Sequence, residues 1–198
     1  MGDGIMTAEI KTKAEVRRQV SRRREEINRD WVALHSRDVV RNLIELDEFK
    51  TADTVCLYMA LPGEVDLNDA LEICWKQRRR VLVPAYRKEN GDYGFKVAAP
   101  DTKMISGLWG VAEPDVGEWA DVEGASCIAV PGVGFDDAGG RVGHGMGYYD
   151  RLLSFTRDRQ DCTKVGICFD FQRYPAVACE AWDIRMDIVL SESRIMRG

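Results

Sequence analysis

Glycines crowd one segment of the chain, Pro131 to Leu153, which reads PGVGFDDAGGRVGHGMGYYDRLL. Seven of its residues are glycine, and the segment then turns aromatic and charged at Tyr148, Tyr149 and Asp150. Because glycine has no Cβ, neighbouring backbone N–H groups can turn toward a single point. Such a concave row of N–H groups holds anions, most often phosphates. The segment therefore predicts a phosphate-binding loop.

The spacing of these glycines does not match two common nucleotide-binding motifs. No Gly-Lys-Ser/Thr follows them, as a Walker P-loop requires. Gly143, Gly145 and Gly147 are evenly spaced, which differs from a dinucleotide-binding fingerprint. A flexible surface turn is the simplest alternative, although such turns rarely end in Tyr-Tyr-Asp-Arg. The residues alone thus indicate anion binding without identifying the anion.

A strand and a helix are expected on either side of the glycine segment. The apolar run 127–130 predicts a buried strand, and the residues from Gly147 to Arg157 suit a helix. The N-terminus of a helix adds free N–H groups and the positive end of a dipole. This order of strand, glycine loop and helix is suited to holding a phosphate.

A helix with a basic face is predicted near the N-terminus. The stretch 12–15 has the S/T-x-x-E spacing of a capping box, which places the start of the helix at Thr12. Three apolar residues recur at helical spacing and form its buried stripe: Val16, Val20 and Ile27. Lys13 and Arg17 are four residues apart and therefore share one face. Taken alone, such a face indicates a solvated surface or a contact with nucleic acid.

The remaining apolar runs alternate between strand and helix patterns. A second helix is expected over 31–46, and its predicted buried side is Leu34, Val39, Leu43 and Leu46. Buried strands are predicted at 54–59, 80–84, 164–169 and 186–190, and an alternating strand around Phe95 and Val97. A helix between the first two strands makes a βαβ unit, which implies parallel pairing. This order predicts one α/β domain over residues 1–198, with helices on both sides of a mostly parallel sheet.

Composition and charge exclude several classes of protein. The chain is 45% hydrophobic and 31% charged, which is ordinary for a soluble globular protein. Its net charge of −5 argues against a general nucleic-acid binder. No apolar run approaches the roughly 18 residues of a membrane span. The N-terminal residues lack the apolar core of a secretory signal, so none is expected.

The six cysteines favour free thiols over disulfides. No pair has the C-x-x-C spacing of a zinc or redox site. Cys56, Cys127 and Cys168 lie inside apolar, strand-like runs, where a thiol behaves as a small hydrophobic group. We therefore expect buried free thiols in a cytoplasmic protein.

The glycine segment resembles the signature of the 5-formyltetrahydrofolate cyclo-ligase family, also called the methenyltetrahydrofolate synthetase family. The family pattern is roughly PG-x-x-F-D-x-x-G-x-R-x-G-x-G-x-G-Y-Y-D-R. This chain matches it at thirteen positions: Pro131, Gly132, Phe135, Asp136, Gly139, Arg141, Gly143, Gly145, Gly147, Tyr148, Tyr149, Asp150 and Arg151. Weaker landmarks follow the family's order, namely Lys13 with Arg17, Glu64 and Glu113-Pro114. With an acidic residue near the C-terminus, the resemblance covers nearly the whole chain.

The resemblance implies a three-layer α/β/α, Rossmann-like fold related to the NagB/RpiA/CoA-transferase-like proteins. It also implies an ATP- and Mg²⁺-dependent ligase. In the family, ATP phosphorylates the formyl oxygen of 5-formyltetrahydrofolate, and the N10 nitrogen attacks the activated carbon. The products are 5,10-methenyltetrahydrofolate, ADP and phosphate. The expected partners of this protein are therefore small molecules, not nucleic acid or membrane, and a cytoplasmic monomer is expected.

The resemblance further implies roles for individual residues. The expected catalytic residues are Arg141 and Lys13. The ATP-binding residues would be Lys13, Arg17, Arg141, Gly143, His144, Gly145, Met146, Gly147 and Tyr149. The folate-binding residues would be Met59, Glu64, Trp109 and Tyr148. Mg²⁺ is expected at Asp150 and Asp187, and Asp187 is preferred to Asp183 because the apolar residues after it resemble the family's closing strand.

Two loop positions need separate comment, and three alternative functions remain to be tested. Met146 stands where some relatives carry Lys and others Gly, and Met adds no charge at the phosphates. His144 falls at a variable position and is not favoured as a general base. The alternatives are a non-catalytic folate or nucleotide binder of the same fold, an RNA-binding protein that uses residues 11–24, and an acyl-activating enzyme for another N-formyl substrate.

Overall fold

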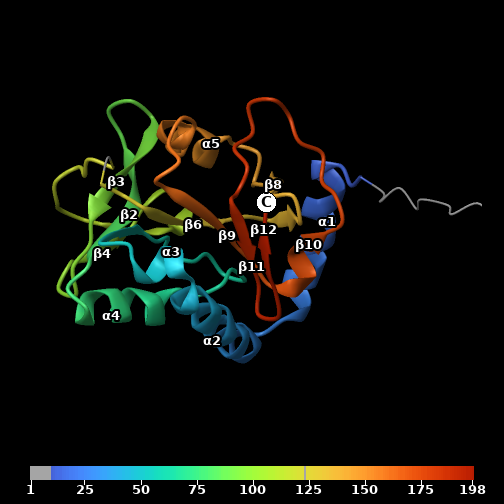
Figure 1. Ribbon diagram of the computed structural model, residues 1–198, viewed down its shortest axis with the longest axis horizontal. Coiled ribbons are helices and arrows are strands. Elements are labelled where there is room, and N and C mark those ends of the chain that lie inside the picture. Colours follow the sequence, from blue (N-terminus) through green and yellow to red (C-terminus); the bar gives the residue numbers. More distant parts are fainter. Residues whose placement is uncertain (1–9, 123) are drawn as a thin grey trace, which may run out of the picture.

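The computed structural model describes residues 10–122 and 124–198, and a seven-stranded sheet forms the centre of this part of the chain (Figure 1). Its strands, in spatial order, are β12 (Ile195–Arg197), β11 (Ile188–Leu190), β9 (Thr163–Ile167), β6 (Cys127–Pro131), β1 (Thr54–Cys56), β2 (Arg80–Arg87) and β3 (Asp92–Val97). The five central strands pair in parallel, whereas β12 and β3 are antiparallel edges. The predicted α/β class with a mostly parallel sheet is confirmed.

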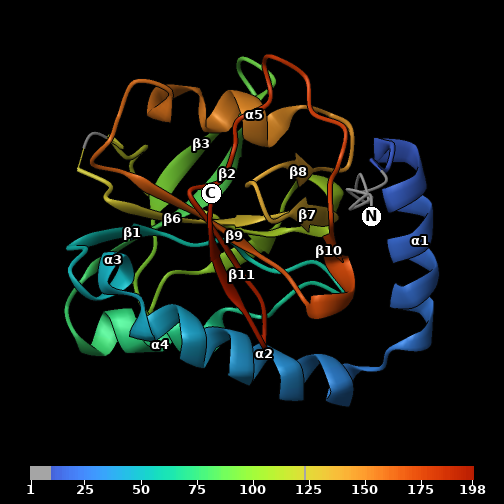
Figure 2. The same cartoon turned by 45° about the vertical axis from the view of Figure 1, so that its right-hand side comes forward.

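Helices lie on both faces of this sheet (Figure 2). One face is covered by α2 (Arg29–Glu45), α3 (Asp47–Lys50) and α4 (Asn68–Lys76). The opposite face is covered by the short helix α5 (Tyr148–Leu152). The first helix, α1 (Lys13–Glu26), stands at the side of the molecule beside a small sheet. The layers are thus unequal, because the face under α5 carries much less helix.

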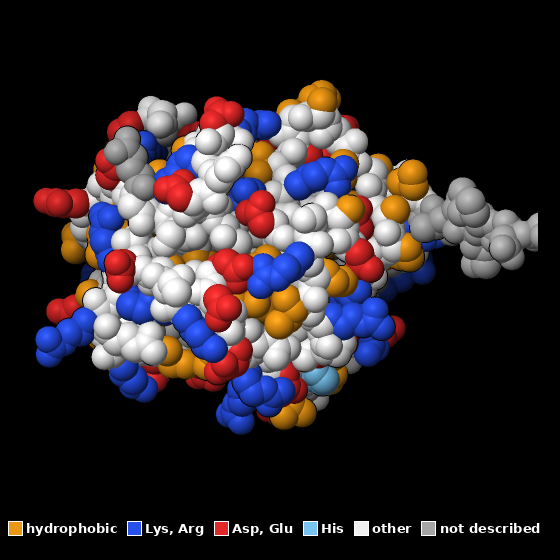
Figure 3. Space-filling model, in the orientation of Figure 1, with side chains coloured by type: hydrophobic (Ala, Val, Ile, Leu, Met, Phe, Trp, Pro, Cys, Tyr) orange, Lys and Arg blue, Asp and Glu red, His pale blue; other side chains and the backbone are white. Residues whose placement is uncertain are grey.

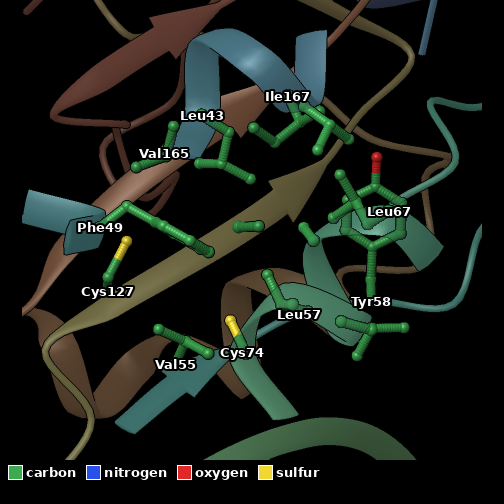
Figure 4. Packing of buried hydrophobic residues seen from close by; sticks show 14 of the residues in the cluster. Leu43, Phe49, Val55, Leu57, Tyr58, Leu67, Cys74, Cys127, Val165 and Ile167 are labelled. Carbon is green, nitrogen blue, oxygen red and sulfur yellow. The ribbon is translucent and has the colours of Figure 1, made fainter. Parts of the chain in front are cut away.

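Side chains along each central strand alternate between two buried clusters. On β6, Cys127 and Ala129 pack toward α2, α3 and α4, whereas Ile128 and Val130 pack toward α5. Figure 4 shows Phe49 of α3 among the first of these clusters. Successive residues of a strand point to opposite faces, so a strand buried on both faces needs a continuous apolar run. This requirement explains why continuous runs predicted these strands.

Two further small sheets were not predicted. The first contains β7 (Gly134–Asp136), β8 (Arg141–Val142) and β10 (Arg173–Tyr174), and the second contains β4 (Met104–Ser106) and β5 (Ala112–Pro114). Each of these strands has only two or three residues, which is too short to show a hydrophobic period. The small sheet of β7, β8 and β10 is nevertheless important, because it contains the first half of the glycine segment.

The N-terminal helix begins where the capping box predicted. Thr12 is its N-cap, and the reciprocal hydrogen bonds between Thr12 and Glu15 are both present. The second helix was predicted within two residues, but Leu34 is 60% exposed and not buried. The buried face of α2 runs through Ser36, whose hydroxyl accepts a hydrogen bond from Asp66 N at 2.9 Å. An apolar pattern misses such a polar contact.

Several predicted elements are shorter than expected, including the strand predicted over 186–190, which begins only at Ile188. The strand predicted over 54–59 ends at Cys56. The helix predicted over 147–157 is only α5, followed by a 3₁₀ turn at 154–156. There the Thr156 hydroxyl donates to the carbonyl of Leu153 at 2.7 Å. The chain passes through this 3₁₀ turn in place of the longer helix.

The cysteine prediction is confirmed for the thiols themselves. All six cysteines belong to the described residues and are free, and only Cys179 is partly exposed. Burial raises the pKa of Cys127 to about 12 and the pKa of Cys162 to about 11. In the described part of the chain, no helix combines the length and the apolar character needed to cross a membrane.

Candidate active site

A cavity of about 1190 Å³ opens at the carboxyl edge of the parallel strands. Tyr58 and Met59 follow β1, Pro84 belongs to β2 and Pro131 ends β6. Ligands of open α/β sheets bind at this edge. Among the described residues, all the predicted site residues except Asp187 line the cavity: Lys13, Arg17, Met59, Glu64, Trp109, Arg141, Gly143, His144, Gly145, Met146, Gly147, Tyr148, Tyr149 and Asp150.

The glycine segment forms one wall of the cavity in two parts. Its first part folds into β7 and β8, and its second part, 143–147, is an open loop that leads into α5. Gly145 and Gly147 have φ values of +104° and +65°, which side chains disfavour. Within the described part of the chain, no backbone N–H of residues 143–147 donates to another protein group. These N–H groups are therefore available to an anion.

Arg141 of β8 enters this wall as a buried cation. Its Nη2 donates to both carboxylate oxygens of Asp150, at 3.1 and 3.0 Å, and its side chain is only 6% exposed. Its Nε is buried and has no acceptor in the described part of the chain. A Cβ on Gly143 would lie 2.9 Å from Arg141 Nη1, so a larger residue at this position would displace the guanidinium. A guanidinium with unused N–H groups suits an oxyanion.

Helix α1 is fixed to the glycine segment by a small apolar cluster. Val16 and Val20 pack against Val133 and Val142, with Val177 completing the group. Because Lys13 and Arg17 lie on neighbouring turns, this packing directs both side chains to the cavity. The basic face predicted for this helix therefore contributes to the site.

Lys13 and Arg17 make different contacts inside the cavity. The Nε of Arg17 donates to the carbonyl of Gly143 at 2.8 Å and so ties the helix to the loop. The Nζ of Lys13 lies 2.7 Å from Asp183 and 3.4 Å from Glu180. Burial acts to lower the pKa of Lys13, but the hydrogen bonds and charges of Asp183 and Glu180 outweigh it and raise that pKa. Lys13 is therefore a stable cation in the cavity.

The structure does not bring Asp187 to the site, and this expectation is corrected. Asp187 immediately precedes β11 and therefore lies at the amino ends of the parallel strands, whereas the cavity lies at their carboxyl ends. Its carboxylate accepts from the Lys164 backbone N at 2.7 Å and pairs with Lys164 Nζ at 2.8 Å. Asp183, four residues earlier, lines the cavity instead. The irregular chain between them places the two acids at different ends of the strands.

Glu64 is a buried acid at the other side of the cavity. Its Oε2 accepts from Leu61 N at 3.0 Å, which fixes the turn after β1. Its Oε1 lies 3.5 Å from His144 Nε2, so the glycine loop and this turn approach each other here. Met59 lines the cavity nearby and is partly buried in the core. A carboxylate beside an apolar surface can bind a flat ring through donors on its edge.

Aromatic side chains complete this side of the cavity. Tyr148 packs edge-to-face on Tyr93, with ring centroids 5.2 Å apart, and the Arg151 guanidinium lies 4.8 Å from the Tyr148 ring. Burial raises the pKa of the neighbouring Tyr149, so its hydroxyl stays neutral. Trp109 lies on the rim with φ +62° and is mostly exposed. These rings offer flat apolar contacts to a ligand.

Several lining residues were missed by reasoning from the sequence. Asp92 and Tyr93 belong to the edge strand β3, and Arg157 and Trp182 belong to irregular segments. The alternating pattern around Phe95 and Val97 predicted the strand but not which of its residues line the cavity. Trp182 and Asp183 are adjacent in the sequence. An aromatic residue next to an acid is the signal that could have pointed to this segment.

The number of carboxylates in the cavity is suited to a metal ion that is bound partly by the protein and partly by a nucleotide. Among the described residues, no group of three or more His, Cys, Asp or Glu side chains could hold a metal ion. Asp150 and Asp183 both line the cavity. Mg²⁺ is usually held by one or two carboxylates together with phosphate oxygens and water. The donor set thus suits Mg²⁺ bound to a phosphate chain.

The charged surface bears on the RNA-binding alternative. Figure 3 shows Lys and Arg side chains interspersed with Asp and Glu over one face of the molecule. That alternative predicts a basic surface that extends beyond α1, and the face shown does not carry a continuous one. The basic residues Lys13 and Arg17 instead line a cavity.

Comparisons with known proteins identify the family of this chain. The model of the 5-formyltetrahydrofolate cyclo-ligase family matches residues 9–192. A probable 5-formyltetrahydrofolate cyclo-ligase of Schizosaccharomyces pombe is 30% identical over 174 residues, covering 81% of this chain and 85% of the relative. The 5-formyltetrahydrofolate cyclo-ligase of Escherichia coli is 28% identical over 147 residues, covering 73% of this chain and 80% of the relative.

Solved structures show the same architecture. The 5,10-methenyltetrahydrofolate synthetase of Aquifex aeolicus superposes with a TM-score of 0.80 at 34% identity and covers 93% of this chain and 92% of its own. The enzyme of the same name from Mycoplasma pneumoniae superposes with a TM-score of 0.72 at 20% identity, over 91% of this chain and 98% of its own, and supports the fold alone. By the extent of the family match and the identity to its members, this chain belongs to the 5-formyltetrahydrofolate cyclo-ligase family.

Proposed function

We propose that this protein converts 5-formyltetrahydrofolate and ATP into 5,10-methenyltetrahydrofolate, ADP and phosphate. The formyl oxygen attacks the γ-phosphorus of ATP, and the bond from that phosphorus to ADP breaks. The N10 nitrogen then attacks the formyl carbon and loses its proton to solvent. The bond between that carbon and the phosphorylated oxygen breaks, and phosphate leaves. No electron acceptor or donor is needed, because the formyl carbon keeps its oxidation state.

The observation behind this proposal is one cavity that has a cationic wall on one side and an aromatic wall on the other. The volume of about 1190 Å³ exceeds the roughly 300–1,000 Å³ of pockets that hold one small ligand. One wall has free N–H groups and three cations, Lys13, Arg17 and Arg141. The other wall has the buried Glu64 and the aromatic rings. This arrangement suits two substrates held side by side, one a polyphosphate and one a flat heterocycle.

The cationic wall is proposed to bind ATP. The loop 143–147, with His144 and Met146 among its residues, would surround the phosphates, and Tyr149 stands behind it. Arg141 would use its unpartnered Nε and its remaining N–H groups on phosphate oxygens. Lys13 would carry charge toward the transferred phosphoryl group, where positioning and charge neutralisation provide most of the catalysis.

The aromatic wall is proposed to bind the folate. The Glu64 carboxylate would accept paired hydrogen bonds from the aminopyrimidine edge of the pterin. Met59 and Tyr148 would contact its ring faces, and Trp109 would cover the ring nearest the rim. The distance of 3.5 Å between His144 and Glu64 joins this wall to the phosphate loop. The formyl group would therefore lie close to the phosphates.

Mg²⁺ is proposed to bind with the nucleotide at Asp150 and Asp183. Both acids line the cavity, and each already faces a cation, Arg141 and Lys13 respectively. When bound, Mg²⁺ would neutralise charge on the phosphate oxygens. The protein's own contribution is to hold these two carboxylates at the cationic wall. Asp187 is not part of this proposal, because it lies at the opposite edge of the sheet.

The decisive experiment follows the product directly. Purified protein mixed with ATP, Mg²⁺ and 5-formyltetrahydrofolate is expected to show the absorbance of the methenyl product growing with time. Omission of ATP should abolish the increase. Folded protein that produces no methenyl absorbance under these conditions would refute the assignment. Binding of either substrate without turnover would instead support the non-catalytic alternative.

A further inference from the structure

A second, smaller cavity of about 410 Å³ adjoins the active site along α1. It is lined by Arg17, Val20, Ser21, Arg24, Glu25, Val133 and His144. Arg17 and His144 line both cavities. Arg24 lies seven residues after Arg17, so the two share one face of α1. The active-site face of this helix therefore continues to a residue that the proposed mechanism does not use.

The guanidinium of Arg24 is mostly buried, and two of its nitrogens form no hydrogen bond in the described part of the chain. The Arg24 side chain is 16% exposed. The two nitrogens are Nε and Nη2, and both are buried. A buried charge without a partner is costly, so such a residue indicates a specific opposite charge. That charge is Glu64, whose Oε1 lies 3.8 Å from Arg24 Nη2.

The contact with Glu64 depends on the shape of the turn that precedes it. Gly63 has a φ of +80°, and a Cβ there would lie 3.2 Å from both Cγ and Cδ of Arg24. The stem of Arg24 therefore packs on the glycine immediately before Glu64. Glycine at this position lets the guanidinium pass close to the backbone and reach the carboxylate of the next residue.

Two basic side chains thus approach the same oxygen of Glu64, but they differ in kind. His144 Nε2 lies 3.5 Å away, and this side chain is 54% exposed. An imidazole is charged only when protonated, whereas a guanidinium is always charged. The burial of Arg24 also leaves it less screened by water. Arg24 is therefore the permanent electrostatic partner of Glu64.

We infer that Arg24 is a positioning residue for folate binding. It acts through Glu64, by setting the direction of that carboxylate and by supplying the positive charge opposite it. This inference rests on the proposed function, in which Glu64 accepts hydrogen bonds from the pterin. Arg24 belongs to the same helix as the proposed phosphate ligands Lys13 and Arg17, so α1 serves both walls of the cavity.

The test compares two arginines of one helix. In Arg24→Met the apolar stem stays and the charge is lost, and Arg22→Met makes the same change at an exposed position of α1. For Arg24→Met, KM for 5-formyltetrahydrofolate is expected to rise about tenfold, which corresponds to about 1.4 kcal/mol. KM for ATP and kcat should stay within about twofold of the unmodified protein. Arg22→Met should leave all three constants unchanged.

A double-mutant cycle separates this role from ordinary packing. If Arg24 acts through Glu64, Arg24→Met should add little to the KM increase already caused by Glu64→Gln. Arg24→Lys keeps a charge without the planar fork and should give a smaller increase in KM than Arg24→Met. It also replaces Arg24→Met in the cycle if that variant does not fold.

The outcomes distinguish this inference from the proposed function. Absence of turnover in the unmodified protein would count against the proposed function itself. Normal turnover with an unchanged folate KM in Arg24→Met would overturn the inference. Equal increases in the two KM values, or full additivity with Glu64→Gln, would overturn it as well, because either result indicates a general packing role.

Discussion

Arg141 meets two requirements of the site with one guanidinium. It pairs with Asp150 through Nη2 and keeps Nε free in a buried position. Its pairing orients the acid proposed to hold Mg²⁺, and its Nε keeps an N–H group that no described protein atom accepts. Asp150 itself is 24% exposed, so water can solvate the carboxylate if the pair is broken. The pair is therefore arranged for binding more than for stability.

This arrangement predicts separate effects on turnover and on folding. Arg141→Ala and Asp150→Asn are each expected to lower kcat about 100-fold or more, because each removes charge placement at the phosphoryl group. The free energy of unfolding should fall by no more than about 1–3 kcal/mol, the cost of a group left without its partner. Steady-state kinetics and urea unfolding measure the two effects.

Asp187→Asn is the matched control for this prediction. Asp187 is also an aspartate in an ion pair, with Lys164, but it lies outside the cavity. Its substitution should leave kcat unchanged. Parallel loss of stability and activity in the Arg141 and Asp150 variants would return both residues to a structural role. Loss of activity in Asp187→Asn would contradict the site as described.

The residue scale also shows where reasoning from the sequence stops. The signature resemblance located Arg141, the loop and Asp150, because those residues are contiguous along the chain. Asp183 and Asp187 are four residues apart in an irregular stretch, and spacing alone does not say which acid turns toward the cavity. Arg24 reaches Glu64 only because α1 docks beside the turn after β1. Such a contact between distant segments leaves no local signal.

At the scale of elements, the site depends on how α1 docks on the small sheet. Gly134 in β7 is a point of close approach, since a Cβ there would lie 2.5 Å from Cγ1 of Val16 and 3.0 Å from the Tyr174 ring. Only glycine allows the helix to approach this strand. The position of Lys13 and Arg17 in the cavity therefore depends on a residue that does not itself line it.

Gly134→Ala is expected to displace α1 and weaken nucleotide binding. The overpacked contact should lower the free energy of unfolding by about 1–3 kcal/mol. KM for ATP should rise more than KM for 5-formyltetrahydrofolate, because Lys13 and Arg17 move with the helix. Gly124→Ala is the control, since no described atom lies within 4 Å of a Cβ at that glycine. Equal effects of the two substitutions on KM for ATP would contradict this account.

Elements were predictable where their own residues determine them. The capping box at Thr12 gave the start of α1, and the continuous apolar runs gave the central strands. The short strands β7, β8 and β10 form because they pair with each other, so their own residues carry no sufficient pattern. The end of the last predicted helix was missed because the chain passes into a 3₁₀ turn at 154–156, which the apolar pattern does not distinguish from a helix.

At the scale of the whole molecule, the two clusters on either side of the sheet also protect the thiols. Cys74 and Cys127 belong to the cluster under α2, α3 and α4, whereas Cys56, Cys162 and Cys168 belong to the cluster under α5. Cys179 lies at the edge of the small cluster beside α1 and is partly exposed. Only the folded arrangement distinguishes this cysteine from the others.

A thiol titration tests this packing. Burial raises the pKa of each thiol, so at pH 8 the neutral form dominates and little reactive thiolate is present. In the folded protein, Cys179 is expected to react first with an aromatic disulfide reagent. The other five should react only after unfolding in guanidinium. Cys179→Ser is the control, and rapid reaction of that folded variant would show that the described packing is wrong.

The way α1 is attached also affects how fast the protein opens locally and releases a ligand. The helix is held by the valine cluster, by the bond from Arg17 to the glycine loop and by the ion pairs of Lys13 and Arg24, while the sheet is buried on both faces. Segments buried on one side open locally before a core buried on both sides, so the amides of α1 are expected to exchange with solvent before those of the central strands. A nucleotide that contacts Lys13, Arg17 and the loop would stabilise the docked position of α1. Local opening of α1 would then limit how long the nucleotide stays bound, because it removes the contacts of Lys13 and Arg17 together.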